Sequence, residues 1–399
     1  MVTRFALLLA ASLTLISTVR AQESDTYLPW EGGPACYRNW SNGPRADASF
    51  FPISVWLQSP SRAEAYKAIG VNQFIGLWKG PTDEQLATLA AAAMPVLATH
   101  NPGVLDMPDI RMLRGWTLMD EPDNAQPKAG GGYGPCVPAE SIVEQYRKLK
   151  EIDDSRPVFL NLGQGVINDA WVGRGVCSHH DEHYPEYIRG ADIISYDVYP
   201  VNGGLPLWYV GAGVERLRAW AKYEKPVWNF IETTSIRGEN KPSAADIKAE
   251  VWMSIIHGSM GIGYFCHQFN PVSDEAALLH DAGIRSAVAA INQQIASLAS
   301  VLNTRSVANG VTVSSSNSGS PVDTMLKRYD GATYLFTVGA RPGGETTVRF
   351  KLRDCGDLTA TVLGEEREIA VQGGELEDRF SDYQVHIYKL PFDPNPNMK

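Results

Sequence analysis

Short apolar runs alternate with longer stretches whose apolar residues recur at helical spacing, from about residue 50 onward. This alternation is typical of parallel β–α units, in which a buried strand is followed by a helix that packs on the sheet. The runs predict strands at Phe51–Trp56, Asn72–Trp78, Met94–His100, Arg114–Asp120, Pro157–Leu162, Ala191–Tyr199, Pro226–Thr233 and Gly261–Gln268. The other stretches predict helices at Ser61–Ile69, Asp83–Ala93, Ala139–Ile152, Val214–Tyr223, Ala244–Gly258 and Asp281–Leu302.

Eight strands with interleaved helices over about 250 residues match a (β/α)8 TIM barrel better than an open, doubly wound sheet. A phosphate-binding loop is not predicted, because Gly130, Gly131 and Gly132 do not follow a strand in the required way and have no partner lysine. The fold class predicted for this part of the chain is therefore α/β.

The pattern changes after Thr304. Turn-rich segments of Ser, Asn, Gly and Pro there separate short alternating runs at Thr333–Val338, Thr346–Leu352, Leu358–Leu363 and Tyr383–Tyr388. Such runs predict a small all-β domain, most simply a sandwich. We therefore expect a barrel over residues 22–303, a β-sandwich over 304–391 and a disordered tail over 392–399.

The first 21 residues have the pattern of an export signal. Arg4 precedes an apolar run from Phe5 to Ile16, and small residues stand at Val19 and Ala21 before the expected cleavage point. The run is too short to span a bilayer, and no later stretch reaches about 18 uninterrupted apolar residues. We expect a soluble mature chain that is secreted or periplasmic and has no membrane partner. A retained N-terminal anchor is the alternative.

Cysteine usage agrees with export but not with a disulfide scaffold, since the chain has five Cys, an odd number. Cys136 and Cys177 fall in loops on the same predicted face of the barrel and are the expected pair. Cys266 lies inside a strand-like run and is expected to be a buried free thiol.

The charge balance bears on possible partners. The chain has 35 basic and 45 acidic residues, a formal net charge of −10, and 44% hydrophobic residues, enough for a large buried core. Nucleic acids and anionic membranes attract concentrated positive charge, and the chain has no run of Lys and Arg. The composition therefore disfavours both as partners.

Two of the predicted strands end in a glutamate. The fourth run leads into Asp120-Glu121-Pro122, and the seventh reaches Glu232. Reacting groups of a (β/α)8 barrel gather at the carboxyl ends of its strands. A pair of carboxylates across the barrel mouth is what cleavage of a glycosidic bond requires, because one protonates the leaving oxygen and the other attacks or stabilises the sugar carbon.

These features resemble clan A of the glycoside hydrolases, retaining (β/α)8 enzymes with catalytic glutamates after strands four and seven. The resemblance covers about residues 50–300 and implies that Glu121 is the general acid/base and Glu232 the nucleophile. Members of the clan usually have Asn directly before the acid/base, whereas this chain has Asp120. Asp120 accepts but does not donate a hydrogen bond to a sugar hydroxyl, and its charge is expected to raise the pKa of Glu121.

Further substrate-binding candidates stand at other strand ends, where aromatic faces and polar groups are available to a sugar. Tyr199, and second Tyr196, match the clan tyrosine that hydrogen-bonds to the nucleophile. Asp197 is either a substrate ligand or a structural partner of a helix N-terminus. The predicted set comprises Trp56, Trp78, His100, Asp120, Asn161, Tyr196, Tyr199, Trp208, His267 and Gln268.

We therefore predict a secreted retaining β-glycoside hydrolase that acts on a polysaccharide or oligosaccharide, with no cofactor and no metal. In retaining enzymes the two carboxyl groups lie about 5–5.5 Å apart. A non-catalytic glycan-binding barrel is one alternative. A metal-dependent hydrolase built on the cluster His179–His183 is another, although no His-Glu-x-x-His motif is present. The sugar, its linkage and the oligomeric state are left open.

Overall fold

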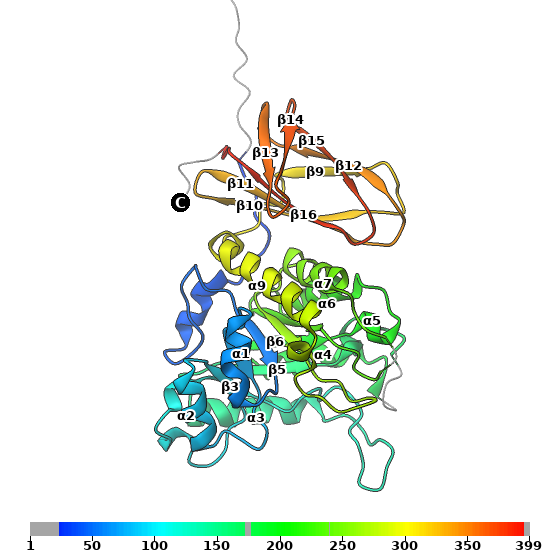
Figure 1. The fold of residues 1–399 in the computed structure, drawn as a ribbon. Helices are drawn as coiled ribbons and strands as arrows, with labels where there is room; N and C mark the ends of the chain where they lie inside the picture. Colours follow the sequence, from blue (N-terminus) through cyan, green and yellow to red (C-terminus); the bar gives the residue numbers. More distant parts are fainter. Residues whose placement is uncertain (1–23, 172–176, 239, 395–399) are drawn as a thin grey trace, which may run out of the picture.

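The computed structural model describes residues 24–171, 177–238 and 240–394 of the 399-residue chain. Figure 1 shows a barrel of strands and helices with a pair of β-sheets stacked above it. The predicted export signal, residues 1–21, lies outside the described residues. Within the described ranges, no helix is both long and apolar enough to cross a membrane.

The predicted barrel is confirmed as a closed sheet of parallel strands in sequence order. Strand β8 pairs with β1, with Gly263 opposite Ser54, and this pairing closes the sheet. Each strand overlaps one predicted run, although most are shorter than predicted. The strands are β1 (Ile53–Trp56), β2 (Gln73–Ile75), β3 (Val96–Ala98), β4 (Leu113–Thr117), β5 (Val158–Leu162), β6 (Ile193–Asp197), β7 (Val227–Glu232) and β8 (Ile262–Phe265).

Helices surround the barrel, and the six predicted ones are all present. Their bounds are α1 (Ala63–Ala68), α2 (Asp83–Ala91), α3 (Ala139–Ile152), α6 (Tyr209–Trp220), α7 (Ala244–Ile256) and α9 (Ala282–Leu302). Three short helices were not predicted: α4 (Tyr184–Arg189), α5 (Pro200–Gly203) and α8 (Ala277–His280). Helix α6 begins five residues before its predicted start at Val214, because Gly211 and Gly213 weaken the helical signal. A Cβ at Gly213 would lie 2.3 Å from the ring of Tyr196, so these glycines let α6 pack closely on the barrel.

Large aromatic side chains fill the interior of the barrel. Trp228 and Phe230 of β7 are buried there with Phe159 of β5. They fit because glycines stand beside them at the start of β8. A Cβ at Gly261, just before β8, would lie 2.8 Å from Trp228, and one at Gly263 would lie 2.4 Å from Phe230. A 3₁₀ turn, η1 (Gly33–Asn39), adds Tyr37, whose hydroxyl accepts a hydrogen bond from Trp228 Nε1 at 2.9 Å.

The predicted all-β domain is also confirmed. One sheet has the strand order β10-β11-β16-β13-β14 and the other β15-β12-β9. Phe350, Leu376 and Tyr388 are fully buried in the core between them. The strands are β9 (Val311–Ser315), β10 (Val322–Tyr329), β11 (Ala332–Gly339), β12 (Thr346–Leu352), β13 (Leu358–Val362), β14 (Arg367–Val371), β15 (Glu375–Phe380) and β16 (Val385–Leu390).

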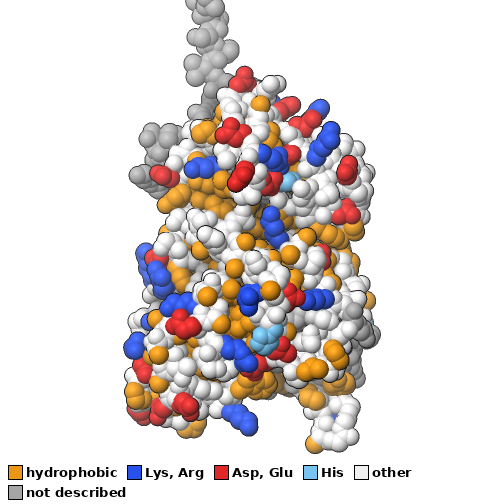
Figure 2. Space-filling model, in the orientation of Figure 1, with side chains coloured by type: hydrophobic (Ala, Val, Ile, Leu, Met, Phe, Trp, Pro, Cys, Tyr) orange, Lys and Arg blue, Asp and Glu red, His pale blue; other side chains and the backbone are white. Residues whose placement is uncertain are grey.

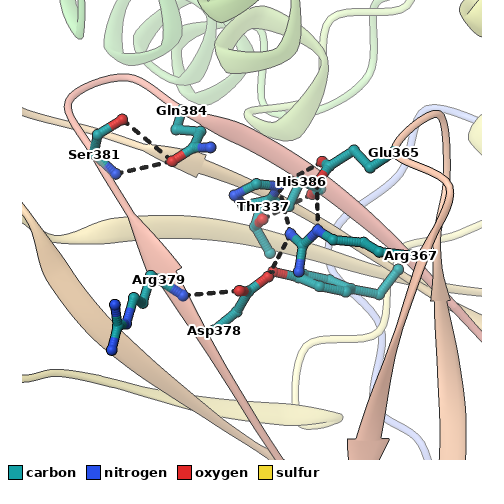
Figure 3. Close-up of polar contacts among 9 residues, drawn as sticks. Thr337, Glu365, Arg367, Asp378, Arg379, Ser381, Gln384 and His386 are labelled. Carbon is teal, nitrogen blue, oxygen red and sulfur yellow. Dashed lines mark hydrogen bonds and ion pairs between the residues drawn. The ribbon is translucent and has the colours of Figure 1, made fainter.

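A polar cluster links strands β14, β15 and β16 of the sandwich (Figure 3). Arg367 lies 2.7 Å from both Glu365 and Asp378. His386 Nδ1 lies 2.5 Å from Glu365, and Tyr388 donates a hydrogen bond to Asp378 at 2.8 Å. The charges of this cluster are mutually compensated, so it serves the packing of the sandwich.

Helix α7 forms much of the contact between barrel and sandwich. Trp252 of α7 stacks on Phe336 of β11, with ring centroids 5.6 Å apart. Just after α7, His257 lies 3.0 Å from Asp323 of β10 and 3.5 Å from Glu215 of α6. Burial alone would lower the pKa of His257, but the hydrogen bonds to these two carboxylates raise it to about 9. The seam therefore combines apolar packing with a charged histidine.

The predicted cysteine pair is present as a disulfide between Cys136 and Cys177. It joins the loop that follows β4 to the loop that follows β5. Cys266 is a buried free thiol, as predicted, and Cys36 and Cys355 are also free.

Charged side chains of both signs are interspersed over the face drawn in Figure 2. Several form local pairs on the sandwich, such as Arg349 with Glu377 at 2.7 Å and Lys351 with Glu375 at 3.4 Å. A concentrated basic patch is not visible on this face.

Candidate active site

A cavity of about 900 Å³ opens where the barrel strands end. Its walls come mainly from the segments that follow β1, β2, β4, β5, β6, β7 and β8, which places it at the face where (β/α)8 enzymes carry their active sites. The lining residues are Trp56, Leu57, Trp78, Asp120, Glu121, Asn124, Tyr133, Gln164, Asn168, Trp171, Asp197, Val198, Tyr199, Asn202, Gly203, Leu205, Ile236, Arg237, Phe265, His267 and Phe269.

Glu121 stands at a sharp turn after β4. Its φ is +43°, in the left-handed region that a residue with a side chain rarely adopts. The turn is held from both sides, because the Glu121 N–H donates to the carbonyl of Asn161 at 3.1 Å and the Glu121 carbonyl accepts from the Asn124 N–H at 3.1 Å. The neighbouring strand leaves room for the carboxylate: a Cβ at Gly163 would lie 3.1 Å from Glu121 Oε1.

Asp197, the last residue of β6, forms a carboxyl pair with Glu121. The Asp197 side chain lies within hydrogen-bonding reach of Glu121 and of the Tyr199 hydroxyl. Its Oδ1 is buried and has no hydrogen-bond partner among the described residues. Burial raises the pKa of Asp197 well above its usual range, and the nearby charges of Glu121 and Asp120 raise it further. Burial and the neighbouring negative charges therefore favour the protonated form of Asp197.

Asp120 lies beside this pair and is oriented by a neighbouring strand. Asn161 of β5 donates from Nδ2 to Asp120 Oδ1 at 3.0 Å, and Asn161 Oδ1 accepts from the Ser195 hydroxyl at 2.7 Å. Asn161 was predicted to bind substrate, but it does not line the cavity and instead positions Asp120. The charge of Asp120 raises the pKa of Asp197.

Asp123 supports the same turn from beneath. Its buried carboxylate accepts hydrogen bonds from the Gly163 N–H at 3.0 Å and from the Tyr184 hydroxyl at 2.9 Å. Burial raises the pKa of Asp123 to about 6. This residue links the turn that carries Glu121 to β5 and α4.

Glu232, the predicted nucleophile, does not line the cavity. It is fully buried at the end of β7. Its carboxylate accepts from the Val201 N–H at 2.6 Å, from the Asn202 N–H at 3.0 Å and from Asn202 Nδ2 at 2.5 Å. Burial raises its pKa, and these hydrogen bonds oppose the rise. Asn202 therefore stands where a substrate-facing carboxylate was expected.

Three of the large aromatic side chains that line the cavity are more than half exposed. The exposed fraction is 55% for Trp78, 53% for Tyr133 and 52% for Phe269. They follow β2, β4 and β8, so aromatic surface is offered from several sides of the opening. Trp56 and Phe265 lie deeper and are partly buried. Aromatic faces in a cleft with polar groups are suited to the apolar C–H faces of sugars.

Five of the ten predicted substrate-binding residues line the cavity. They are Trp56, Trp78, Asp120, Tyr199 and His267. His267 is mostly buried, and desolvation lowers its pKa, so its ring is neutral at neutral pH. Tyr199 was predicted to hydrogen-bond to Glu232, but the carboxylate beside it is Asp197.

Two of the other predicted binding residues, Tyr196 and His100, make contacts away from the cavity. Tyr196 faces outward, where its hydroxyl donates to the carbonyls of Tyr209 and Val210 in α6. His100 packs edge-on against Trp116, with centroids 5.1 Å apart.

Trp208 and Gln268 also lie off the cavity wall. Trp208 packs against Tyr209 and beneath Arg341 of the sandwich, at 5.2 Å. Gln268 pairs with Asp274 through the backbone, and its side chain donates to the carbonyl of Val272. Together with Asn161, Tyr196 and His100, these are the five predicted substrate-binding residues that do not line the cavity.

Sequence reasoning missed several lining residues because they lie in loops. Tyr133, Asn168 and Trp171 come from the long segments after β4 and β5, and Arg237 from the segment after β7. Strand ends can be located from an apolar run, whereas loop conformation depends on tertiary contacts. The disulfide between these two loops was the one available signal that they approach each other.

The histidine cluster is a surface feature. Ligand atoms of His180, Glu182 and His183 lie within 4.8 Å of one another, and all three residues are exposed. The rings of His180 and His183 stack with an interplanar angle of 13°, and His180 Nδ1 lies 2.9 Å from Glu182. None of the three lines the cavity, and the structure therefore offers no support for a catalytic metal at this cluster.

Comparison with known proteins shows a likeness of fold. No protein-family model and no curated protein sequence matches the chain. Among solved structures, an α-amylase from Geobacillus thermoleovorans complexed with acarbose has a TM-score of 0.51 and 12% identity, covering 88% of this chain and 99% of that one. A GH42 β-galactosidase from G. stearothermophilus has a TM-score of 0.54 and 9% identity, covering 86% and 98%.

An α-amylase from Anoxybacillus is similar as well, with a TM-score of 0.52, 10% identity and coverage of 87% and 99%. At these identities the likeness defines the architecture alone. The chain has the (β/α)8 fold of solved glycoside hydrolases. Because the aligned part exceeds the barrel, the likeness extends into the β-sandwich.

Proposed function

We propose that the protein is a glycoside hydrolase whose reacting groups are Asp197 and Glu121. The observation that carries this proposal is the close pair of carboxyl groups, Asp197 and Glu121, at the wall of a large, aromatic-lined cavity. Cleavage of a glycosidic bond needs one proton donor and one carboxylate, and a carboxyl pair with one member protonated supplies both. The fold likeness to an α-amylase and a β-galactosidase supports the same class of reaction.

In the free protein the proton resides on Asp197, because burial raises its pKa. Asp197 then protonates the leaving oxygen, and the Glu121 carboxylate attacks or stabilises the anomeric carbon. The clan resemblance made Glu121 the acid/base, whereas here Asp197 is the acid and Glu121 takes the nucleophile's role. Carboxyl groups within hydrogen-bonding reach of each other are closer to the spacing of about 5–5.5 Å of retaining enzymes than to the 6.5–9.5 Å of inverting ones. Retention of configuration is therefore part of the proposal.

The substrate class follows from the size and lining of the cavity. A volume of about 900 Å³ lies near the upper end of ligand pockets, which suits an oligosaccharide or a segment of polysaccharide better than a single sugar. Export of the chain, expected from residues 1–21, would place the enzyme with such polymers outside the cytoplasm.

The roles can be separated by comparing leaving groups. Asp197→Asn should lower kcat/KM by about 10²–10⁴-fold on unactivated glycosides. Its loss on 2,4-dinitrophenyl glycosides should be much smaller, because dinitrophenolate leaves without a proton. Glu121→Gln should abolish turnover of both substrates, and azide should restore turnover to Glu121→Ala. Asp106→Asn and Glu64→Gln are matched exposed controls on the same barrel.

The pair predicted from the sequence gives a different result. If Glu232 is the nucleophile and Glu121 the acid/base, azide restores turnover to Glu232→Ala, and the leaving-group dependence belongs to Glu121. Wild-type protein that binds glycans but turns over no member of a glycoside panel would refute both assignments and favour a glycan-binding barrel.

A further inference from the structure

A second carboxyl pair lies behind the cavity wall. Glu232 at the end of β7 and Glu250 on α7 are both fully buried, and their side chains lie within hydrogen-bonding reach of each other. Both Glu250 oxygens are buried, and neither has a hydrogen-bond partner among the described residues. Two ionised carboxylates only accept hydrogen bonds and would repel each other here. A hydrogen bond between them therefore requires a proton on one of the two. Neither residue has a Lys or Arg ion-pair partner among the described residues.

We propose that Glu250 is a positioning residue that keeps one proton and donates it to the Glu232 carboxylate, which in turn holds α5 and Asn202 at the cavity wall. The proton is on Glu250 because Glu232 already accepts from the N–H groups of Val201 and Asn202, which favour its charged form. Burial and the charge of Glu232 raise the pKa of Glu250 well above its usual range.

Of the groups that face Glu250, only the backbone of Glu232 favours its ionised form, and burial and the Glu232 charge outweigh it. Asp246 lies one turn earlier on α7 and adds negative charge, although its carboxylate is engaged in the cap at Ser243. Tyr196 of β6 lies on the other side, and its hydroxyl donates to backbone carbonyls of α6. Neither supplies a positive charge, so both favour the protonated form of Glu250.

The link from this pair to the cavity runs through Asn202. Besides binding Glu232, its side chain donates to the carbonyl of Thr234 at 2.9 Å and accepts from the Ile236 N–H at 2.8 Å. Asn202 and Ile236 both line the cavity. Two segments of the wall, after β6 and after β7, are therefore fixed by one amide that the Glu232 carboxylate orients.

The experiment measures the proton directly in the unliganded protein. Infrared difference spectra at about pH 8 should show one carboxylic-acid C=O band in wild type that Glu250→Gln lacks, because the raised pKa keeps Glu250 protonated there. The exposed control Glu64→Gln should leave every acid band in place. Since no substrate is needed, the result is independent of whether glycosidase activity is found.

Thermal unfolding gives a second readout with a defined sign. Unfolded Glu250 ionises near its usual pKa of 4.5, whereas the folded protein keeps the proton to higher pH. As pH rises above 4.5, unfolding therefore releases a proton from Glu250, and wild type becomes less stable. Glu250→Gln does not titrate, so its Tm relative to wild type should increase from about pH 5 to about pH 8. Glu250→Leu, which cannot donate, should have a lower Tm than Glu250→Gln at both pH values.

Three results would each overturn the proposal. One is an unchanged set of acid bands in Glu250→Gln, which would mean that Glu250 is ionised. Another is a Tm difference between Glu250→Gln and wild type that does not change with pH. If instead Glu250→Gln and Glu250→Leu are equally stable, the donated hydrogen bond has no positioning role.

Discussion

A substitution at Gly163 tests whether the position of the Glu121 carboxylate controls kcat. The φ of Gly163 is −82° and its ψ 180°, so alanine adopts this backbone without strain. An added Cβ would, however, lie 2.6 Å from Asn124 Nδ2 and 3.1 Å from Glu121 Oε1. Gly163→Ala therefore presses on the candidate catalytic carboxylate and on a cavity residue, while its backbone N–H still binds Asp123.

The size of the effect follows from these distances. Relaxed carbon contacts begin at about 3.5 Å, so the Asn124 amide must move by roughly 0.9 Å and the Glu121 carboxylate by roughly 0.4 Å. A misplacement of about 1 Å costs about 10²-fold in rate, so a shift of a few tenths of an ångström in Glu121 should lower kcat by about 3- to 30-fold. The added methyl group should lower the free energy of unfolding by about 1–3 kcal/mol through overpacking. Because alanine restricts the unfolded chain more than glycine does, roughly 0.4–1 kcal/mol of this loss is offset.

The assay compares kcat and urea unfolding of Gly163→Ala with those of Gly356→Ala. A Cβ added at Gly356 would meet no heavy atom within 4 Å, and the backbone there has no left-handed φ, so this substitution should change neither quantity. If kcat falls under conditions where urea unfolding shows that Gly163→Ala is fully folded, the loss of activity comes from the turn and not from unfolding. Wild-type kcat in Gly163→Ala would refute the view that the position of Glu121 sets the rate.

Three further changes should have separable effects. Replacing Cys136 and Cys177 with Ser opens a link over a sequence separation of 41 and should lower the free energy of unfolding by about 4 kcal/mol in a urea titration; an unchanged midpoint would contradict this. Trp78→Ala should raise KM for an oligosaccharide about three- to tenfold with Tm unchanged, because the side chain is 55% exposed; a lower Tm would indicate a packing role instead. His257, whose pKa is raised to about 9, stabilises fully below its unfolded pKa of about 6.5, and this contribution is lost as pH rises to about 9. The Tm difference between wild type and His257→Gln should shrink over that interval, and a constant difference would show that Asp323 and the histidine are not coupled.

The barrel could be predicted from sequence because each buried parallel strand leaves an apolar run that contrasts with its flanking helix. The predicted runs at Pro157–Leu162 and Pro226–Thr233 extend beyond β5 and β7 by one residue at most at either end. The short helices α4 and α5 were missed, since four to six residues are too few to show a helical period. The disulfide was predicted for the right reason, because both loops lie at the carboxyl ends of the strands.

The candidate site was only partly predictable, and the two acid pairs show why. Glu121 follows β4, and its turn delivers it to the cavity as expected. Glu232 also ends a strand, but α5 folds over it and covers it with the backbone of Val201 and Asn202. Asp197 lies at the end of β6, where the sequence left a substrate ligand and a structural partner equally open.

The sequence by itself determined the strand order, the all-β domain that follows and the gathering of carboxylates at strand ends, because these depend on local apolar periodicity. Only the tertiary structure decided which carboxylates meet. Asp197 approaches Glu121, while Glu232 approaches Glu250. The physical reason is that the direction of a side chain at the end of a strand depends on the helix and loop that pack against it. These come from distant parts of the chain and leave no mark in the residue's own neighbourhood.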